Sequence, residues 1–156
     1  MKEHPSCSRV QCELEPVVVQ RALDRLGVRG DPRGSRRIDV RDGAMVELDG
    51  WIESPPTAIE VCVTVGDPKP GQQRKLRADI LKLALLRKAR TPPPRCLLVV
   101  TSGDAARWLQ QGWTDLAVRL MGVEVQVEEL TVPEEKKLAS ARKRQAAGQR
   151  TSSPSP

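Results

Sequence analysis

The chain has 156 residues and a formal net charge of +6, and it contains neither Phe nor Tyr. This length corresponds to one ordinary domain, and three Trp residues are too few for a surface that stacks bases on aromatic rings. Residues 134–156 hold six Lys and Arg against two Glu, so they carry +4 of the charge and residues 1–133 carry only +2. Such a tail attracts any polyanion or simply aids solubility, and charge alone does not identify a partner.

We expect a flexible N-terminus over residues 1–11, a single domain over residues 12–133, and a basic, largely disordered tail over residues 134–156, whose first part is a candidate helix. Apolar runs are far shorter than the ~20 residues that span a bilayer, and none resembles a secretory signal. We therefore expect a cytoplasmic protein without membrane contact and with reduced thiols. A zinc site at His4, Cys7 and Cys12 is disfavoured, because no obvious fourth ligand accompanies them.

Helical spacing of apolar residues predicts a first helix within residues 13–30. Alternating residues around the Asp42-Gly43 turn predict a β-hairpin over residues 38–53. A third strand over residues 57–65 follows the break at Ser54-Pro55-Pro56. Its alternation places Ile59, Val61 and Val63 on one face, and Glu60, Cys62 and Thr64 on the other.

The second half of the chain has the pattern of an α/β unit. A long amphipathic helix is predicted over residues 67–90, a buried strand over residues 95–102, a helix broken near Gly112 over residues 103–122, and a last strand over residues 123–130. The element order is α, β, β, β, α, β, α, β, which predicts an α/β fold with a mixed sheet.

Two carboxylates stand out in the strands. Asp49 lies at the end of one strand, and the Ser-Pro-Pro turn folds the next strand back so that Glu60 lies beside it. Two neighbouring carboxylates either share a proton or bind a cation, and oxygen ligands of this kind suit Mg²⁺. The alternatives are that Asp49 is only a turn residue and that Glu60 lies on a half-solvated face.

The hairpin with Asp49, the strand with Glu60 and the helix containing KPGQQRKLRADILKLALL resemble the PD-(D/E)XK, or restriction-endonuclease-like, nuclease superfamily. The resemblance covers roughly residues 12–101 and implies an αβββαβ core, here followed by an extra helix and strand. The chain is also similar to a group of small, uncharacterised actinobacterial proteins.

The resemblance implies a Mg²⁺ or Mn²⁺ ion held by Asp49 and Glu60, with Glu15 or Glu13 of the first helix completing the site, and hydrolysis of phosphodiester bonds. The superfamily's lysine, two residues after the second acid, is replaced here by Cys62. Some members supply this lysine from the following helix, so Lys75 is the favoured candidate. The alternative is that Lys75 and Lys82 lie on a solvated helix face and pair with Asp79.

Nucleic acid, with DNA favoured, is the expected partner. Its predicted contacts are Lys69, Gln72 and Lys82 on the long helix and Arg36 and Arg37 before the hairpin, in a loop that also holds Arg29 and Arg33. A homodimer or a partner protein is left open. Two other functions are also left open: a binding module of the same fold that has lost catalysis, and an unrelated α/β regulatory protein whose acids are surface groups.

Overall fold

The structure is a computed structural model, and it describes residues 9–32 and 36–150. His4, Cys7 and Arg33 lie outside these residues, as does most of the predicted N-terminal segment. Cys12 is disulfide-bonded. This differs from the expectation of reduced thiols, and it removes Cys12 as a thiolate ligand for zinc.

Five helices and six strands make up the described chain. In order they are α1 (Arg9–Arg25), β1 (Arg36–Arg41), β2 (Ala44–Leu48), β3 (Gly50–Glu53), β4 (Pro56–Cys62), α2 (Pro70–Ala89), β5 (Arg95–Val100), α3 (Gly103–Leu109), α4 (Gly112–Leu120), β6 (Val123–Val127) and α5 (Val132–Arg150). None of the described helices is long and apolar enough to cross a membrane.

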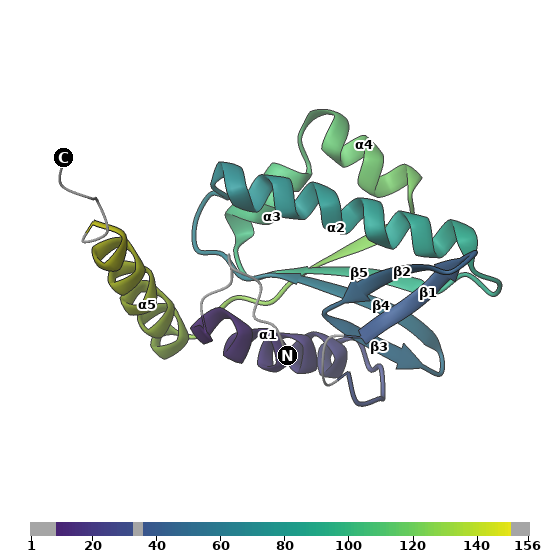
Figure 1. Cartoon of the computed structure of the whole chain (residues 1–156), viewed down its shortest axis with the longest axis horizontal. Helices are drawn as coiled ribbons and strands as arrows, with labels where there is room; N and C mark the ends of the chain where they lie inside the picture. Colours follow the sequence, from purple (N-terminus) through teal and green to yellow (C-terminus); the bar gives the residue numbers. More distant parts are fainter. Residues whose placement is uncertain (1–8, 33–35, 151–156) are drawn as a thin grey trace.

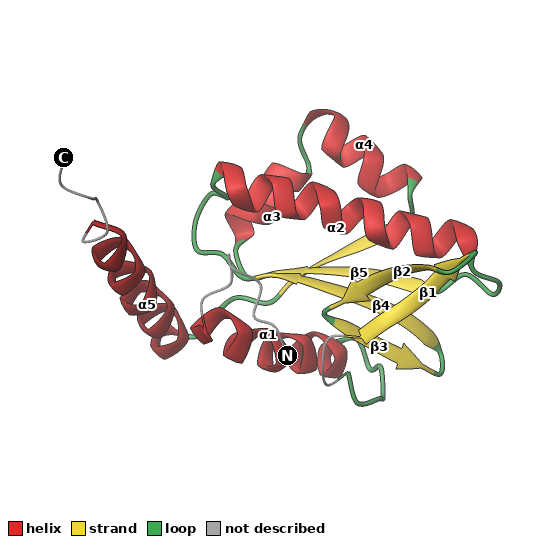
Figure 2. Cartoon of the chain, in the orientation of Figure 1, coloured by secondary structure: helices red, strands yellow, loops and turns green. Residues whose placement is uncertain are grey.

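The main sheet has the strand order β3-β4-β5-β6. β3 pairs with β4 in an antiparallel manner, whereas β4 with β5 and β5 with β6 are parallel. Helices cover both faces of this sheet (Figure 2), as expected for a sheet with parallel strands. The α/β class with a mixed sheet is therefore confirmed.

The alternation of side chains along β4 separates two apolar layers. Ile59, Val61 and Val63 pack with α1, and Ala58 and Cys62 pack with α2, as the sequence pattern predicts. In Figure 1, α1 lies below the sheet, and α2, α3 and α4 lie above it.

The hairpin forms as predicted, but its second strand is divided. Asp42 and Gly43 have φ of 53° and 78°, the positive values that a tight two-residue turn requires. β2 pairs with β1 in a separate two-stranded sheet, and after Asp49 the chain continues as β3 in the main sheet. Asp49 therefore lies where the chain passes from one sheet to the other.

The helix predicted over residues 103–122 is broken as expected, because α4 begins at Gly112 with φ of 56°. The tail begins with a helix, as its sequence suggests, but this helix is longer than expected. α5 extends to Arg150, and it is attached where Leu138 and Ala141 are buried against the layer that contains α1. The prediction of a largely disordered tail is wrong for residues 134–150, because these two contacts stabilise a helix whose composition is otherwise polar. α5 points away from the rest of the chain in Figure 1.

Candidate functional site

Asp49 covers a stretch of β4 that has no strand partner on that side. The pairing of β3 with β4 ends at Gly50 and Ile59. Immediately beyond this point, the Oδ2 atom of Asp49 accepts a hydrogen bond of 2.8 Å from the backbone N–H of Val61. The Asp49 side chain thus replaces a strand at this edge, and a turn residue alone would not need this contact.

Glu60 lies next to this edge, on the face of β4 that points toward α2. Its side chain is only 1% exposed, and it forms an ion pair with Lys82 of α2. Neither carboxylate oxygen of Glu60 accepts a well-aligned hydrogen bond within the described part of the chain. The alternative of a half-solvated Glu60 is therefore wrong, and so is the reading in which this acid is a surface group.

The surroundings of Glu60 disfavour its ionised form. Burial, followed by the carboxylates of Asp79 and Asp49, raises the pKa of Glu60 from 4.5 to about 9, while Lys82 acts in the opposite direction. Asp49 thus lies close enough to interact with Glu60 through space, as the Ser-Pro-Pro turn predicts. A buried acid with an elevated pKa is costly to keep, and such groups are concentrated at functional sites.

α2 contributes a row of three charged side chains to the same place. Lys75, Asp79 and Lys82 are four and three residues apart, a spacing that puts them on one side of the helix. The Nζ atom of Lys75 donates hydrogen bonds to the backbone O of Val61 at 2.8 Å and to Oδ2 of Asp79 at 2.7 Å, and it lies 3.6 Å from Oδ2 of Asp49. Lys75 therefore contacts the β4 edge and Asp49 together.

Lys82 occupies the other end of this row. Its Nζ atom lies 3.3 Å from Oδ1 of Asp79 and donates a hydrogen bond of 3.1 Å to the backbone O of Glu47. Together with the ion pair to Glu60, these contacts give an alternating chain of charges from Asp49 through Lys75, Asp79 and Lys82 to Glu60. The pairing of both lysines with Asp79 is confirmed, but the two side chains contact β4 or the other acids, so the alternative of a solvated helix face is wrong.

Asp79 is the site residue that the sequence did not identify. Its spacing from Lys75 and Lys82 predicts the ion pairs, but it gives no sign that the carboxylate is only 3% exposed. Burial raises the pKa of Asp79, although both lysines act in the opposite direction. The two lysine ammonium groups share this carboxylate, so it fixes both of their positions.

The two lysines keep their charge at neutral pH. Burial lowers the pKa of Lys75, but Asp79 and Asp49 outweigh it and raise the pKa above the usual value for lysine. For Lys82, burial acts in the same direction, and Glu60 and Asp79 again raise the pKa. Each lysine is thus a fixed positive charge and not a proton acceptor.

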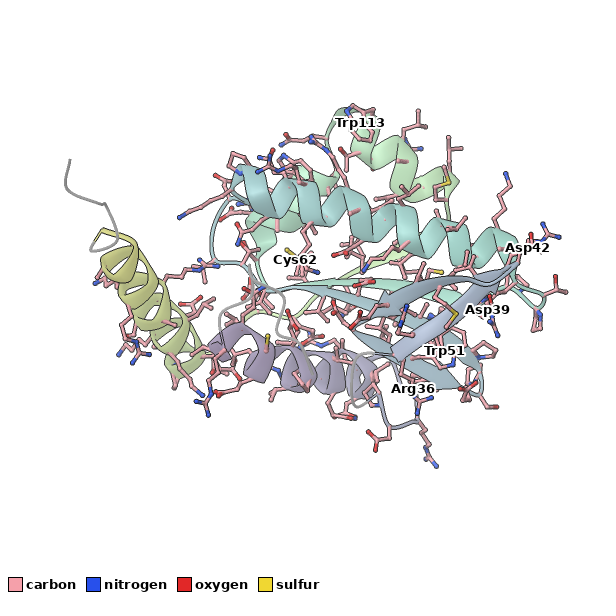
Figure 3. The ribbon with its side chains drawn as sticks, in the orientation of Figure 1. Arg36, Asp39, Asp42, Trp51, Cys62 and Trp113 are labelled. Atoms are coloured by element: carbon pink, nitrogen blue, oxygen red, sulfur yellow. The ribbon has the colours of Figure 1, made fainter. Side chains whose placement is uncertain are left out.

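Cys62 stands at the position where the resemblance implies a lysine. Its side chain is buried, and burial raises the pKa of the thiol to about 12 despite the nearby Lys75 ammonium. In Figure 3 it lies between α2 and α1. The thiol is neutral at physiological pH, and the positive charge near position 62 comes from Lys75 of α2, the alternative source that the resemblance implies.

Of the two acids proposed from the first helix, only Glu15 reaches the site. Burial and the Asp49 carboxylate raise the pKa of Glu15 from 4.5 to about 7, and Lys75 opposes them. Glu13 is exposed and forms an ion pair of 2.8 Å with Lys137 of α5. α1 therefore places Glu15 beside Asp49, and Glu13 links α1 to α5 instead.

The remaining predicted nucleic-acid contacts have no hydrogen bond or ion pair with these charges among the contacts of the described residues. Lys69 is exposed at the start of α2, where its backbone N–H donates to Oε1 of Gln72 at 2.9 Å, so Gln72 serves as a helix cap. The Nη1 atom of Arg36 lies 3.3 Å from Oε1 of Glu53. Arg37 is exposed, and it pairs with Glu47 across the two strands β1 and β2. In Figure 3 Arg36 lies on the hairpin, well separated from Cys62.

The carboxylates fit a divalent cation only in part. Within residues 9–32 and 36–150, no three His, Cys, Asp or Glu side chains are arranged to hold one metal ion. The predicted three-ligand set of Asp49, Glu60 and Glu15 is thus not assembled. Asp49 and Glu60 are adjacent, however, and Glu60 has oxygens without hydrogen bonds. Two carboxylates fit Mg²⁺, which commonly takes one or two carboxylates and completes its shell with water and phosphate.

A cavity of about 400 Å³ lies elsewhere, beyond the carboxyl ends of β4 and β5. Its lining includes the acidic residues Asp104, Glu129 and Glu135 together with Ser102. None of the predicted site residues lines it, and negative walls are unsuited to a polyanion. Comparison of the chain with protein-family models, with curated proteins and with solved structures found no match.

Proposed function

We propose that the chain is a metal-dependent phosphodiesterase of the restriction-endonuclease-like type that acts on nucleic acid, with DNA as the favoured substrate. The observation that carries this proposal is the grouping of Asp49, Glu60 and Lys75 at the unpaired edge of β4. Two adjacent carboxylates beside a fixed ammonium match the charge pattern that hydrolysis of a phosphodiester requires.

Asp49 and Glu60 would hold a Mg²⁺ or Mn²⁺ ion, which supplies an activated water and polarises the phosphate when bound. Lys75 remains charged, so its role is to stabilise negative charge on the phosphate or the attacking oxygen. Lys82 has two acceptors besides Glu60, namely Asp79 and the carbonyl of Glu47. It therefore keeps partners when Glu60 turns toward a cation.

The direct test is cleavage of plasmid, single-stranded DNA and RNA in the presence of Mg²⁺ or Mn²⁺. Asp49→Ala and Glu60→Ala should reduce cleavage to background, while Asp39→Ala, which removes an exposed carboxylate on the hairpin (Figure 3), should leave it unchanged. Titration of Mn²⁺ by calorimetry provides a second measurement that does not depend on turnover. Cleavage or Mn²⁺ binding that survives both substitutions would exclude this site.

A binding module that has lost catalysis is the second candidate. The ion pair between Lys82 and Glu60 favours it, because this pair already neutralises one proposed ligand. The absence of a third ligand within the described residues favours it as well. In this case, labelled duplex DNA should bind equally well with and without EDTA, binding should weaken as salt rises, and the Asp49 and Glu60 variants should bind as the wild type does.

A further inference from the structure

α5 carries a run of positive charge that no acid of the same run balances. Residues 136–144 hold five Lys and Arg residues and no Asp or Glu. Lys137 forms an ion pair of 2.8 Å with Glu13 of α1. The other four have no ion pair within the part of the chain that the structure describes. We call these four the α5 basic face: Lys136, Arg142, Lys143 and Arg144.

The side of α5 that packs on the rest of the chain is the apolar one. Leu138 and Ala141 are buried in the layer that contains α1. Lys136 and Lys143 are seven residues apart, so they share the side of the helix opposite these two residues, and the two arginines of the α5 basic face flank them. α5 points away from the rest of the chain in Figure 1. The α5 basic face is therefore open to a large ligand.

The chemistry of this face favours a phosphate backbone over a membrane or a protein. A helix that binds a membrane surface needs a free apolar side, but Leu138 and Ala141 are already buried. A protein interface is usually anchored by aromatic or other large side chains, and the exposed residues among the basic ones here are only Ala139 and Ser140. Contacts to phosphates need no apolar anchor, because Lys, Arg and Ser side chains supply them.

The density of charge fits a duplex. The α5 basic face extends over about 12 Å of helix axis, and duplex DNA carries about seven phosphate charges over that length. Single strands are bound largely by stacking on aromatic side chains, and α5 has none. We propose that the α5 basic face binds the backbone of double-stranded DNA. The choice of DNA rests on the proposed function, but none of these residues belongs to the group around Asp49 and Glu60.

Fluorescence anisotropy of a labelled DNA duplex, measured in EDTA at a series of salt concentrations, tests this proposal. Lys143→Gln with Arg144→Gln should weaken binding by about tenfold and should reduce the slope of log K against log salt by about two, one for each lost phosphate contact. Lys88→Gln with Arg119→Gln removes the same charge from exposed residues of α2 and α4, and this control should bind as the wild type does. Circular dichroism should show that all variants fold.

The outcomes separate this inference from the proposed function. A wild type that binds duplex through α5 but does not cleave it would support the inference and count against the nuclease activity. Equal weakening by the two pairs of Gln substitutions would overturn the inference, because net charge alone would then attract the DNA. A wild type that does not bind duplex even at low salt would overturn it as well, and so would tighter binding to phosphatidylserine vesicles than to the duplex.

Discussion

Replacement of Glu60 by Gln is expected to stabilise the metal-free protein. Glu60 is buried next to the carboxylates of Asp79 and Asp49, and Lys82 is the cation paired with it. Gln has nearly the same shape but carries no charge, so the substitution removes the unfavourable electrostatic interactions while it preserves packing. Stabilisation by loss of a proposed catalytic group would show that this acid is retained for function.

The magnitude follows from the elevated pKa. The pKa of Glu60 rises from 4.5 in the unfolded chain to about 9 in the folded one, so at pH 7 folding requires Glu60 to take up a proton, which costs about 3 kcal/mol. This cost already includes the opposing effect of Lys82 on the pKa of Glu60, so it is the upper limit of the stabilisation. We therefore expect Glu60→Gln to raise the free energy of unfolding by up to about 3 kcal/mol at pH 7.

The sign of the pH dependence follows from the same shift. Because the folded-state pKa is the higher one, the folded chain binds the extra proton, and this contribution to stability is complete below about pH 4.5 and is lost as the pH rises to about 9. The stability advantage of Glu60→Gln over the wild type should therefore grow steadily over this range.

Urea unfolding with chelator present, followed by circular dichroism at several pH values between about 5 and 9, measures this difference. Glu53→Gln is the matched control, because Glu53 is a largely exposed glutamate of the neighbouring strand, and its effect should stay within about 0.5 kcal/mol. A Glu60→Gln variant less stable than the wild type at pH 7, or a difference that is constant with pH, would refute the reasoning.

Three further substitutions test the roles of the other charges. Lys75→Met should lower cleavage by about a hundredfold and leave Mn²⁺ affinity intact, whereas Lys88→Met, at an exposed lysine of the same helix, should have no effect on either measurement. Asp79→Asn should lower kcat with little change in KM for DNA, because both lysines lose the carboxylate that they share; an unchanged kcat would exclude a positioning role. Glu15→Gln should abolish any inflection near pH 7 in the pH–rate profile, since the pKa of Glu15 is about 7; an inflection that persists would assign it to another group.

Local patterns in the sequence predicted most of the fold. The alternation along residues 57–65 placed Ile59, Val61 and Val63 on one face and Cys62 on the other. The Asp42-Gly43 pair predicted the hairpin turn, and Gly112 predicted the break between α3 and α4. Each of these features depends on backbone geometry or on a two-residue period, which a short stretch of sequence determines by itself.

Features that depend on distant contacts were not predicted. The sequence near Asp49 does not indicate that β2 and β3 belong to different sheets, because the sheet of each strand depends on the strand with which it pairs. Likewise, the helical period puts Asp79 beside Lys75 and Lys82, but the burial of its carboxylate is set by β4 and by the residues packed around it. The start of α5 was expected, but its extent to Arg150 was not, because Leu138 and Ala141 are the buried apolar residues that this polar segment contributes to the core.

The contacts of Asp49 and Lys75 with Val61 have a consequence for solubility. Together these two side chains satisfy the N–H and C=O of a residue that β3 leaves without a partner. An uncovered strand edge of this kind can pair with the backbone of another molecule, and natural proteins protect such edges with charged groups. Asp49 and Lys75 therefore also protect this strand edge from pairing with another molecule. A variant that lacks both side chains should precipitate more readily on warming, even where its helices and sheet form normally.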